Sequence, residues 1–319
     1  MRRYLLAVLV FVSLTAFAAC GDDEGAGEKS ASGTKLSPIQ MNSANEGKKV
    51  TIGSKNFTEE FILGNIYSQA LEAAGYTVKE EFNLGSEQIA NRALKRGQVD
   101  AYPEYTATAL TSFFDVKIAD LPKSASAVYE QAKAEYAKEG LTALPPTPFS
   151  DAQAVGMTKT EAKRLGVKTI SDLKPKENQI VFAGTPECKQ RVDCLLGLEQ
   201  DYGLKFKKFI TVDIAQRYKA ADDGQAQLIV VFTTDGQLAT GKYQVLVDDK
   251  HLFPPYNATL VIDSKKLKSL GPDVRKVVGQ VQKGTTEAVM RELNSRVDID
   301  KQEPKDVATQ YLRETGLVR

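Results

Sequence analysis

The chain has 319 residues, of which 42% are hydrophobic and 26% charged, and these values predict a globular protein with room for two domains. Lysine and arginine number 42 against 41 aspartate and glutamate residues. Because this balance leaves no basic field to recruit DNA or RNA, the composition argues against a nucleic-acid partner.

Residues 1–20 have the pattern of an export signal. Two arginines precede an apolar stretch from Leu5 to Phe17 that is short for a membrane span. The residues that end at Cys20 resemble the lipobox of bacterial lipoproteins, which implies cleavage before Cys20 and acylation of that cysteine. The protein is therefore expected to be exported, and an acylated Cys20 would anchor it to the outer face of the cytoplasmic membrane. An ordinary cleaved signal is the alternative.

Residues 21–48 are rich in glycine, serine, alanine and charged residues and lack apolar periodicity. This composition predicts a disordered tether between the anchor and the folded body.

Strands and helices alternate from residue 49 onward, as in a parallel α/β sheet. Asn56 and Glu59 form a potential capping box for the first helix. Prolines at 145, 146 and 148 interrupt the pattern, and we place a crossing between two lobes at residues 147–157. The predicted strands are 50–53, 77–82, 99–102, 179–183, 206–212, 227–232, 243–247 and 258–262, and the predicted helices include 86–96, 125–138, 193–202 and further segments from 272 onward.

This pattern predicts two α/β lobes joined by two crossing segments. The first lobe comprises residues 49–150 and 252–319, and the second comprises residues 151–251. A sequence echo fits the division, since Gly97 precedes Tyr105 by eight residues and Gly224 precedes Phe232 by eight. If both lobes repeat one device, the two aromatic residues occupy equivalent carboxyl ends of parallel strands, where open α/β sheets bind ligands.

Signs of catalysis or of a metal or other cofactor are few. No nucleophile elbow, phosphate-binding loop or dinucleotide motif occurs, and His251 is the single histidine. Cys188 and Cys194 lack the partners of a zinc site, so a small disulfide loop or two free thiols remain open. We expect a binding protein and no enzyme.

Three segments in order carry a more specific signal: Ile52 to Glu59, Tyr102 to Thr108, and Phe253 to Tyr256. Together they resemble the signature segments of glycine betaine/choline-binding proteins of osmoprotectant ABC transporters. The resemblance runs from about Lys49 to the C-terminus, and it implies a type II periplasmic-binding-protein fold.

In that family, aromatic rings surround a trimethylammonium group and polar groups hold a carboxylate. The resemblance implies Tyr105, Phe232 and Tyr256 as rings and Asp151 as the acidic residue near the cation. Gln153 stands where relatives commonly have a further ring. Arg191 would hold the ligand carboxylate, helped by the Lys55 backbone amide and the Thr108 hydroxyl.

Elementary chemistry agrees with this assignment, because a quaternary ammonium has no N–H to donate whereas the faces of aromatic rings attract it. The expected function is capture of glycine betaine, choline or a similar solute and its delivery to an ABC permease. One alternative is another zwitterion, such as ectoine, carnitine or an amino acid. A second is an exported choline-ester hydrolase that uses Asp151 or His251.

Overall fold

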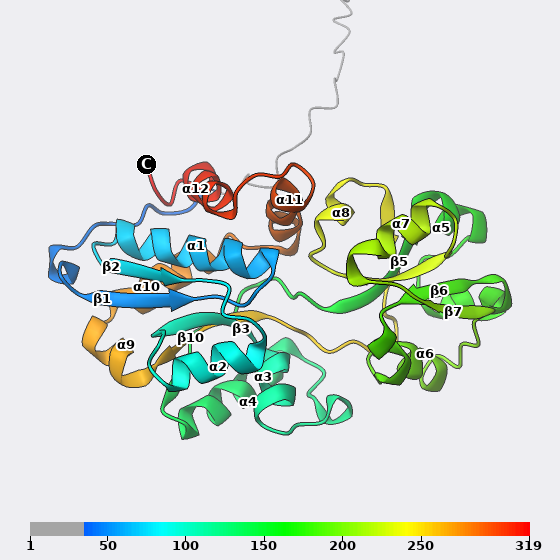
Figure 1. Ribbon diagram of the computed structural model, residues 1–319, viewed down its shortest axis with the longest axis horizontal. Coiled ribbons are helices and arrows are strands. Elements are labelled where there is room, and N and C mark those ends of the chain that lie inside the picture. Colours follow the sequence, from blue (N-terminus) through cyan, green and yellow to red (C-terminus); the bar gives the residue numbers. More distant parts are fainter. Residues whose placement is uncertain (1–34) are drawn as a thin grey trace, which may run out of the picture. The chain divides into compact units, whose positions relative to one another are not determined.

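The computed structural model describes residues 35–319, which form two five-stranded sheets, each covered by helices (Figure 1). In the first sheet, β2, β1 and β3 are parallel, and β10 runs antiparallel between β3 and β4. The strand bounds are β1 (Lys49–Gly53), β2 (Thr77–Glu81), β3 (Ala101–Tyr105), β4 (Leu141–Ala143) and β10 (Ala258–Asp263).

The second sheet repeats this topology with the order β7-β6-β8-β5-β9. Here β7, β6 and β8 are parallel and β5 runs antiparallel between β8 and β9. The strands are β5 (Gln153–Thr158), β6 (Val181–Gly184), β7 (Lys208–Thr211), β8 (Leu228–Phe232) and β9 (Tyr243–Val245). Each sheet with its helices is one lobe, so the predicted two-lobed α/β fold is confirmed.

Tyr105 and Phe232 end equivalent strands of the two lobes. β3 and β8 each occupy the middle of their sheet, with a parallel neighbour on one side and an antiparallel one on the other. The echo in the sequence predicted this equivalence, and the strand order confirms it.

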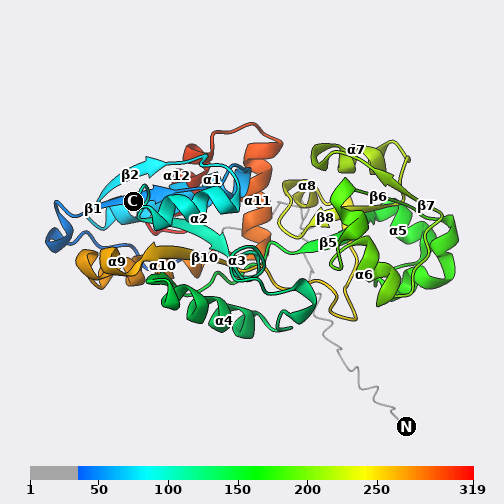
Figure 2. The same cartoon turned by 60° about the horizontal axis from the view of Figure 1, so that its bottom comes forward.

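Amphipathic helices enclose both sheets. The C-terminal helices α10, α11 and α12 pack against α1 of the first lobe, and α11 also lies beside α8 of the second lobe (Figure 2). The first lobe contains α1 (Thr58–Ala73), α2 (Glu87–Lys95), α3 (Thr106–Phe113), α4 (Ala125–Lys138), α9 (Ser264–Leu270), α10 (Asp273–Gln282), α11 (Glu287–Asp298) and α12 (Pro304–Glu314), and the second contains α5 (Lys159–Leu165), α6 (Leu195–Gln200), α7 (Arg217–Asp222) and α8 (Gly236–Ala239).

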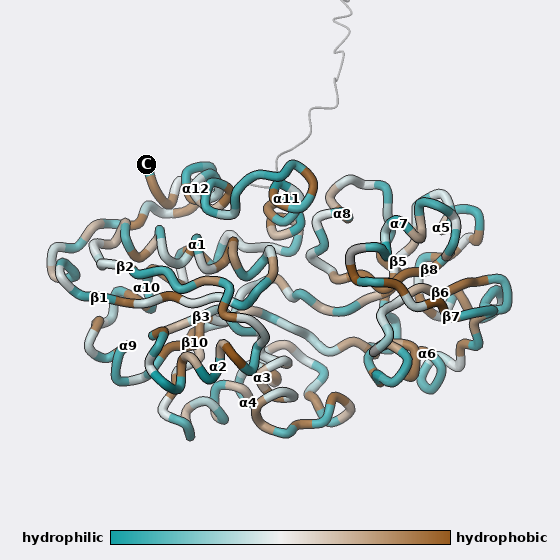
Figure 3. The backbone as a smooth tube through the Cα atoms, in the orientation of Figure 1, coloured by the Kyte–Doolittle hydropathy of each residue, from teal (hydrophilic) through white to brown (hydrophobic). Residues whose placement is uncertain are grey.

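Each lobe has its own apolar core. In the second lobe, hydrophobic residues gather along β6, β7 and β8 (Figure 3), as expected of strands covered on both faces. Leu252 belongs to this core, although the sequence analysis assigned it to the first lobe. An apolar side chain is buried where a core lies within reach, so the chain returns to the first lobe only after this residue.

Two crossing segments connect the lobes and pair with each other. Ser150 and Asn257 form an isolated antiparallel bridge, and the Asp151 amide donates to the Tyr256 carbonyl at 3.1 Å. β5 begins within the range predicted for the first crossing, which shortens that crossing. The crossings place Asp151 and Tyr256 beside the carboxyl ends of the parallel strands. This is the edge at which open α/β sheets bind ligands.

The segment preceding β1 differs from the expected tether. The Leu36 amide donates to the Thr315 carbonyl at 2.7 Å and the Ile39 amide to the Leu317 carbonyl at 2.8 Å. Both side chains pack on the first core. The prediction of disorder is therefore wrong for residues 35–48, because a few apolar side chains and backbone hydrogen bonds tie them down. The signal peptide, Cys20 and residues 21–34 lie outside the described residues.

Across residues 35–319, every helix is too short or too polar to cross a membrane.

Candidate ligand-binding site

A cavity of about 240 Å³ lies where the crossings meet the two lobes. All eight binding residues expected from the sequence line it, together with two that were not expected. The lining residues are Lys55, Phe57, Glu87, Tyr105, Thr108, Asp151, Gln153, Arg191, Phe232 and Tyr256.

Three aromatic side chains expected to bind the cation reach this cavity from different elements. Tyr105 ends β3, Phe232 ends β8, and Tyr256 lies in the returning crossing segment. The Tyr105 hydroxyl donates to Glu59 Oε1 at 2.6 Å, and the Tyr256 hydroxyl donates to Asp193 Oδ2 at 3.2 Å. These hydrogen bonds anchor the hydroxyl ends of the two tyrosines.

Glu59 is a buried carboxyl group and Asp151 a partly buried one, and both lie beside the rings. Asp151 Oδ1 accepts from the Thr234 hydroxyl at 2.7 Å, and Glu59 Oε2 accepts from Asn294 Nδ2 at 2.8 Å. Burial raises the pKa of Asp151 to about 6 and, with a smaller contribution from Asp151, that of Glu59 to about 8. Neither forms an ion pair within residues 35–319. At pH 7 Glu59 is therefore largely protonated and Asp151 largely ionised, so Asp151 supplies a negative charge that a bound cation would balance.

Lys55 plays a different part from the one expected. Its backbone amide donates to Glu60 Oε2 at 3.1 Å and is therefore not free to hold a ligand carboxylate, which corrects the prediction. Its ammonium group lies 2.5 Å from Glu104 Oε1 and 4.4 Å from the Tyr105 ring centroid. Burial alone would lower the pKa of Lys55, but Glu104 and Glu60 raise it above its ordinary value.

Arg191 is already paired within the protein. Its Nε and Nη2 donate to the two carboxylate oxygens of Asp193 at 2.8 and 2.5 Å. Asp193 is fully buried, whereas 42% of the Arg191 side chain is exposed. Asp193 thus fixes one edge of the guanidinium and leaves the remaining N–H groups for an incoming anion.

Gln153 opens β5 directly opposite Phe232 in the strand register. Its side-chain amide donates to the Asp193 carbonyl at 2.7 Å. Thr108 lines the cavity from α3, an element that the sequence analysis missed.

The structure joins Cys188 and Cys194 by a disulfide, with 5.2 Å between their Cα atoms. Arg191 and Asp193 lie between these two cysteines, which are six positions apart in the sequence. The alternative of two free thiols is not observed.

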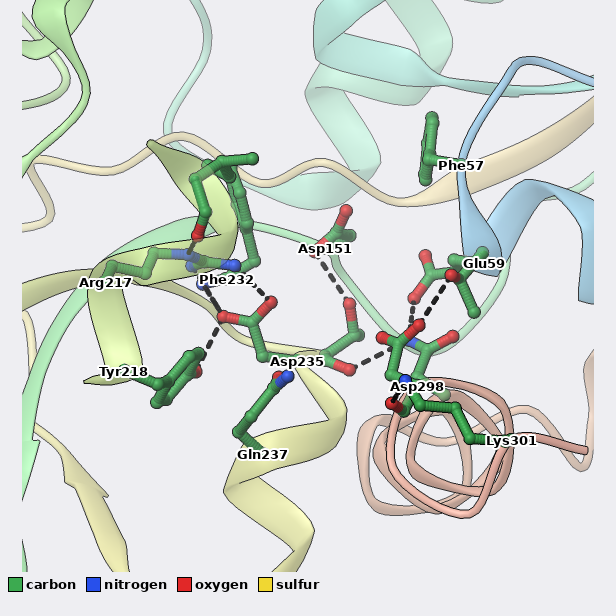
Figure 4. Close-up of a pocket in the computed structure, with 14 residues that line it drawn as sticks. Phe57, Glu59, Asp151, Arg217, Tyr218, Phe232, Asp235, Gln237, Asp298 and Lys301 are labelled. Atoms are coloured by element: carbon green, nitrogen blue, oxygen red, sulfur yellow. Dashed lines mark hydrogen bonds and ion pairs between the residues drawn. The ribbon is translucent and has the colours of Figure 1, made fainter. Parts of the chain in front are cut away.

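A larger cavity of about 750 Å³ adjoins the first and shares Phe57, Asp151 and Phe232 with it (Figure 4). Arg217 lies against the Phe232 ring, with its guanidinium carbon 4.8 Å from the centroid, and forms two 2.7 Å hydrogen bonds to Asp235. Asp235 also accepts from the Phe232 amide at 2.7 Å. These contacts fix the Phe232 ring in position.

Sequence reasoning missed several of these residues. Glu59 was assigned to a capping box, but the N-cap of α1 is Phe57 and no side chain caps this helix. The Glu59 carboxyl group instead accepts hydrogen bonds from Tyr105 and Asn294. Phe57 and Glu59 both left a usable signal, since they belong to the segment Ile52 to Glu59 that was already singled out.

His251 is exposed and lines neither cavity, so of the two residues that the hydrolase alternative would use, only Asp151 lies at the site. Within the described part of the chain, no three histidine, cysteine, aspartate or glutamate side chains form a potential metal site.

Two α/β lobes of matching topology, joined by two crossings and sharing one cavity, define a solute-binding protein of the type II periplasmic kind. Comparison with known families narrows this class. The chain belongs to the family of substrate-binding domains of ABC-type glycine betaine transport systems, which it matches over residues 48–314.

Relatives and solved structures agree with the family. A glycine-betaine-binding protein of Pseudomonas aeruginosa is 34% identical over 86% of this chain and 90% of its own length. An ergothioneine transport permease/binding protein of Helicobacter pylori is 31% identical over 85% of this chain, but the match spans only 48% of that protein. The structure of apo YehZ from Escherichia coli superposes with a TM-score of 0.74, at 26% identity, and the match covers 85% of this chain and 100% of that one.

Proposed function

We propose that this protein captures a small quaternary-ammonium solute, of the glycine betaine or choline kind, outside the cytoplasm and delivers it to the permease of an ABC importer. The observation that carries the proposal is the convergence of Tyr105, Phe232 and Tyr256 on one cavity beside Asp151, which forms no ion pair within residues 35–319. The name of the Pseudomonas aeruginosa relative points to the same ligand class.

The recognition step follows from the chemistry of the walls. Ring faces attract a methylated ammonium group, and each desolvated ring contributes about 0.5–2 kcal/mol. Asp151 adds a negative charge, and the exposed edge of Arg191 can accept the carboxylate of a betaine. Three rings, one carboxylate and one guanidinium support binding in roughly the micromolar range.

Titration calorimetry with choline, glycine betaine, carnitine and ectoine tests this proposal. We expect binding of the trimethylated compounds and at least tenfold weaker binding of the Tyr105→Ala variant. Binding of ectoine, together with no binding of any trimethylated compound, would contradict the proposed ligand class.

The adjoining cavity of about 750 Å³ favours a second candidate, a larger zwitterion. Carnitine and ergothioneine are named for two relatives, and both belong in the same titration. A preference for either over glycine betaine by tenfold or more would select this candidate.

The lipid anchor at Cys20 belongs to the proposal as well. A Cys20→Ala variant should be released from the membrane fraction, and intact mass should show the loss of the acyl groups. A variant that stays with the membrane would exclude anchoring through this cysteine.

A further inference from the structure

Phe57 is an exposed aromatic residue at the rim of the site. It is the N-cap of α1, its backbone is extended with φ −143° and ψ 162°, and 39% of the residue is exposed. Among the described residues it is the one aromatic side chain in the group of strongly exposed large apolar residues. Single exposed apolar residues are common on protein surfaces, so exposure alone assigns no role.

The position of the Phe57 side chain indicates a role in ligand binding, which its exposure alone does not. Phe57 lines both the smaller and the larger cavity, and Figure 4 shows Asp151 lying between Phe57 and Phe232. The two phenylalanine rings come from different lobes. A ligand group beside Asp151 would therefore have an aromatic side chain on either side.

The Phe57 ring lies nearly parallel to Tyr105, with 6.2 Å between the centroids and an interplanar angle of 21°. The Lys55 ammonium is 4.4 Å from the Tyr105 centroid and 5.7 Å from that of Phe57. A single cation of the protein itself thus lies within cation–π distance of both rings. This geometry demonstrates that the pair can share one positive charge.

Gln153 contributes no ring to its side of the cavity, and its side-chain amide donates to the Asp193 carbonyl at 2.7 Å. The first lobe contributes Tyr105 as its one expected ring, while Phe232 comes from the second lobe and Tyr256 from the crossing. A further ring from the first lobe would add a fourth aromatic side chain to the wall of the cavity.

We propose that Phe57 is a fourth ring of the binding site, which contacts the ligand ammonium group from the first lobe and selects charged over neutral head groups. This inference rests on the proposed function and adds a residue that determines its specificity. By the strength of one cation–π contact, we expect loss of the ring to weaken binding about 3- to 30-fold.

Choline and its neutral isostere 3,3-dimethyl-1-butanol are suitable probes. They share shape and hydroxyl group but differ in charge, and choline has no carboxylate for Arg191. The variants are Phe57→Leu, which keeps apolar bulk without a ring, and Phe57→Tyr, which keeps the ring. Ile214→Ala is the matched control, because Ile214 is 46% exposed and lines only the larger cavity.

Calorimetry and competition should show a 3- to 30-fold loss of choline affinity in Phe57→Leu, less than a twofold change for the isostere, and near-wild-type choline binding in Phe57→Tyr and Ile214→Ala. Equal affinity of the leucine and tyrosine variants for choline would overturn the proposal, even if the isostere binds too weakly to measure. Equal losses for both probes would also overturn it, since Phe57 would then only fill space.

A wild-type chain that binds no methylated amine would contradict the proposed function itself. Wild-type binding that Phe57→Leu leaves unchanged would contradict only the role of Phe57.

Discussion

Asp151 is the carboxyl group closest to the proposed position of the cation, between Phe57 and Phe232. Burial raises its pKa to about 6, while Lys55 and Arg217 act in the opposite direction. A bound cation favours the ionised form, so protonation must weaken binding. The affinity for a cationic ligand should therefore depend on pH near 6.

We expect choline affinity to fall by up to about tenfold between pH 6 and 5. Calorimetry at matched ionic strength measures this profile. The Asp151→Asn variant should bind more weakly and lose the pH dependence over that interval. A wild-type affinity that stays constant down to pH 5 would show that the ionised Asp151 carboxylate does not contribute to choline binding.

Glu59 affects stability as well as binding. Its ordinary pKa of 4.5 rises to about 8 in the folded protein, chiefly by burial. A raised carboxyl pKa means that the folded state holds its proton more tightly, so this contribution to stability is present below pH 4.5 and is lost as the pH rises to 8.

We expect Glu59→Gln to reduce the decline of the unfolding free energy between pH 5 and 8, by up to about 1.4 kcal/mol per pH unit. Urea denaturation at several pH values gives the slope. Part of the decline should persist, because burial also raises the pKa of Glu60 to about 8. The exposed Glu46→Gln variant is the control, and a Glu59→Gln slope equal to that control would contradict the expectation.

At the scale of elements, α8 and α11 pack unusually closely. A Cβ atom at Gly236 would lie 2.7 Å from the Ser295 amide nitrogen and 2.9 Å from the Asn294 carbonyl carbon. Asn294 donates at 2.8 Å both to Glu59 of the first lobe and to the Thr234 carbonyl of the second. This helix contact therefore links the two lobes next to the site.

Gly236→Ala should force α8 and α11 apart, lower the unfolding free energy by about 1–3 kcal/mol and weaken ligand binding. Gly279→Ala in α10 is the matched control, because a Cβ there meets no atom within 4 Å. That control should gain about 0.5–1 kcal/mol from helix propensity. Chemical denaturation compares the two, and equal effects would exclude steric contact as the cause.

The loop closed by Cys188 and Cys194 is the second element on which the site depends. Replacing both cysteines by serine should lower the unfolding free energy by about 2 kcal/mol. Because the loop carries Arg191 and Asp193, glycine betaine should lose more affinity than choline. Calorimetry with both ligands measures the two losses. Equal losses of affinity would show that the disulfide does not contribute to recognition of the carboxylate.

On the scale of the whole molecule, the cavity takes side chains from both lobes. A ligand that contacts Tyr105 and Phe232 together favours conformations in which both lie close to it. Conformations with separated lobes lose part of these contacts, so binding should shift the population toward closure.

We expect choline at 100 times its dissociation constant to raise the unfolding free energy by about 2.7 kcal/mol and to reduce the radius of gyration in small-angle scattering. Tyr105→Ala, which should bind at least tenfold more weakly, should lose at least about 1.3 kcal/mol of this stabilisation at the same choline concentration. Stabilisation without any change in the radius of gyration would argue against closure.

Local pattern determined much of the fold. The alternation of strand and helix predicted β1, β2, α2 and α4 to within two residues, and the echo between the lobes placed Tyr105 and Phe232 at equivalent strand ends. These features depend on periodicity and on glycine-terminated helices, which short stretches of sequence encode. β5 was mistaken for a crossing because six residues next to prolines carry little periodic signal.

The family resemblance carried by three motifs in order also assigned eight of the ten residues that line the cavity, although Asp151, Gln153, Arg191 and Phe232 lie outside those motifs. The partners of those residues were decided only by the tertiary structure: the Lys55 amide is bonded to Glu60, Arg191 is held by Asp193, and Glu59 is directed toward Tyr105. The physical reason is that a buried polar or charged group pairs with whichever partner folding brings beside it. Glu59 and Tyr105 are 46 positions apart, and no local pattern specifies their contact.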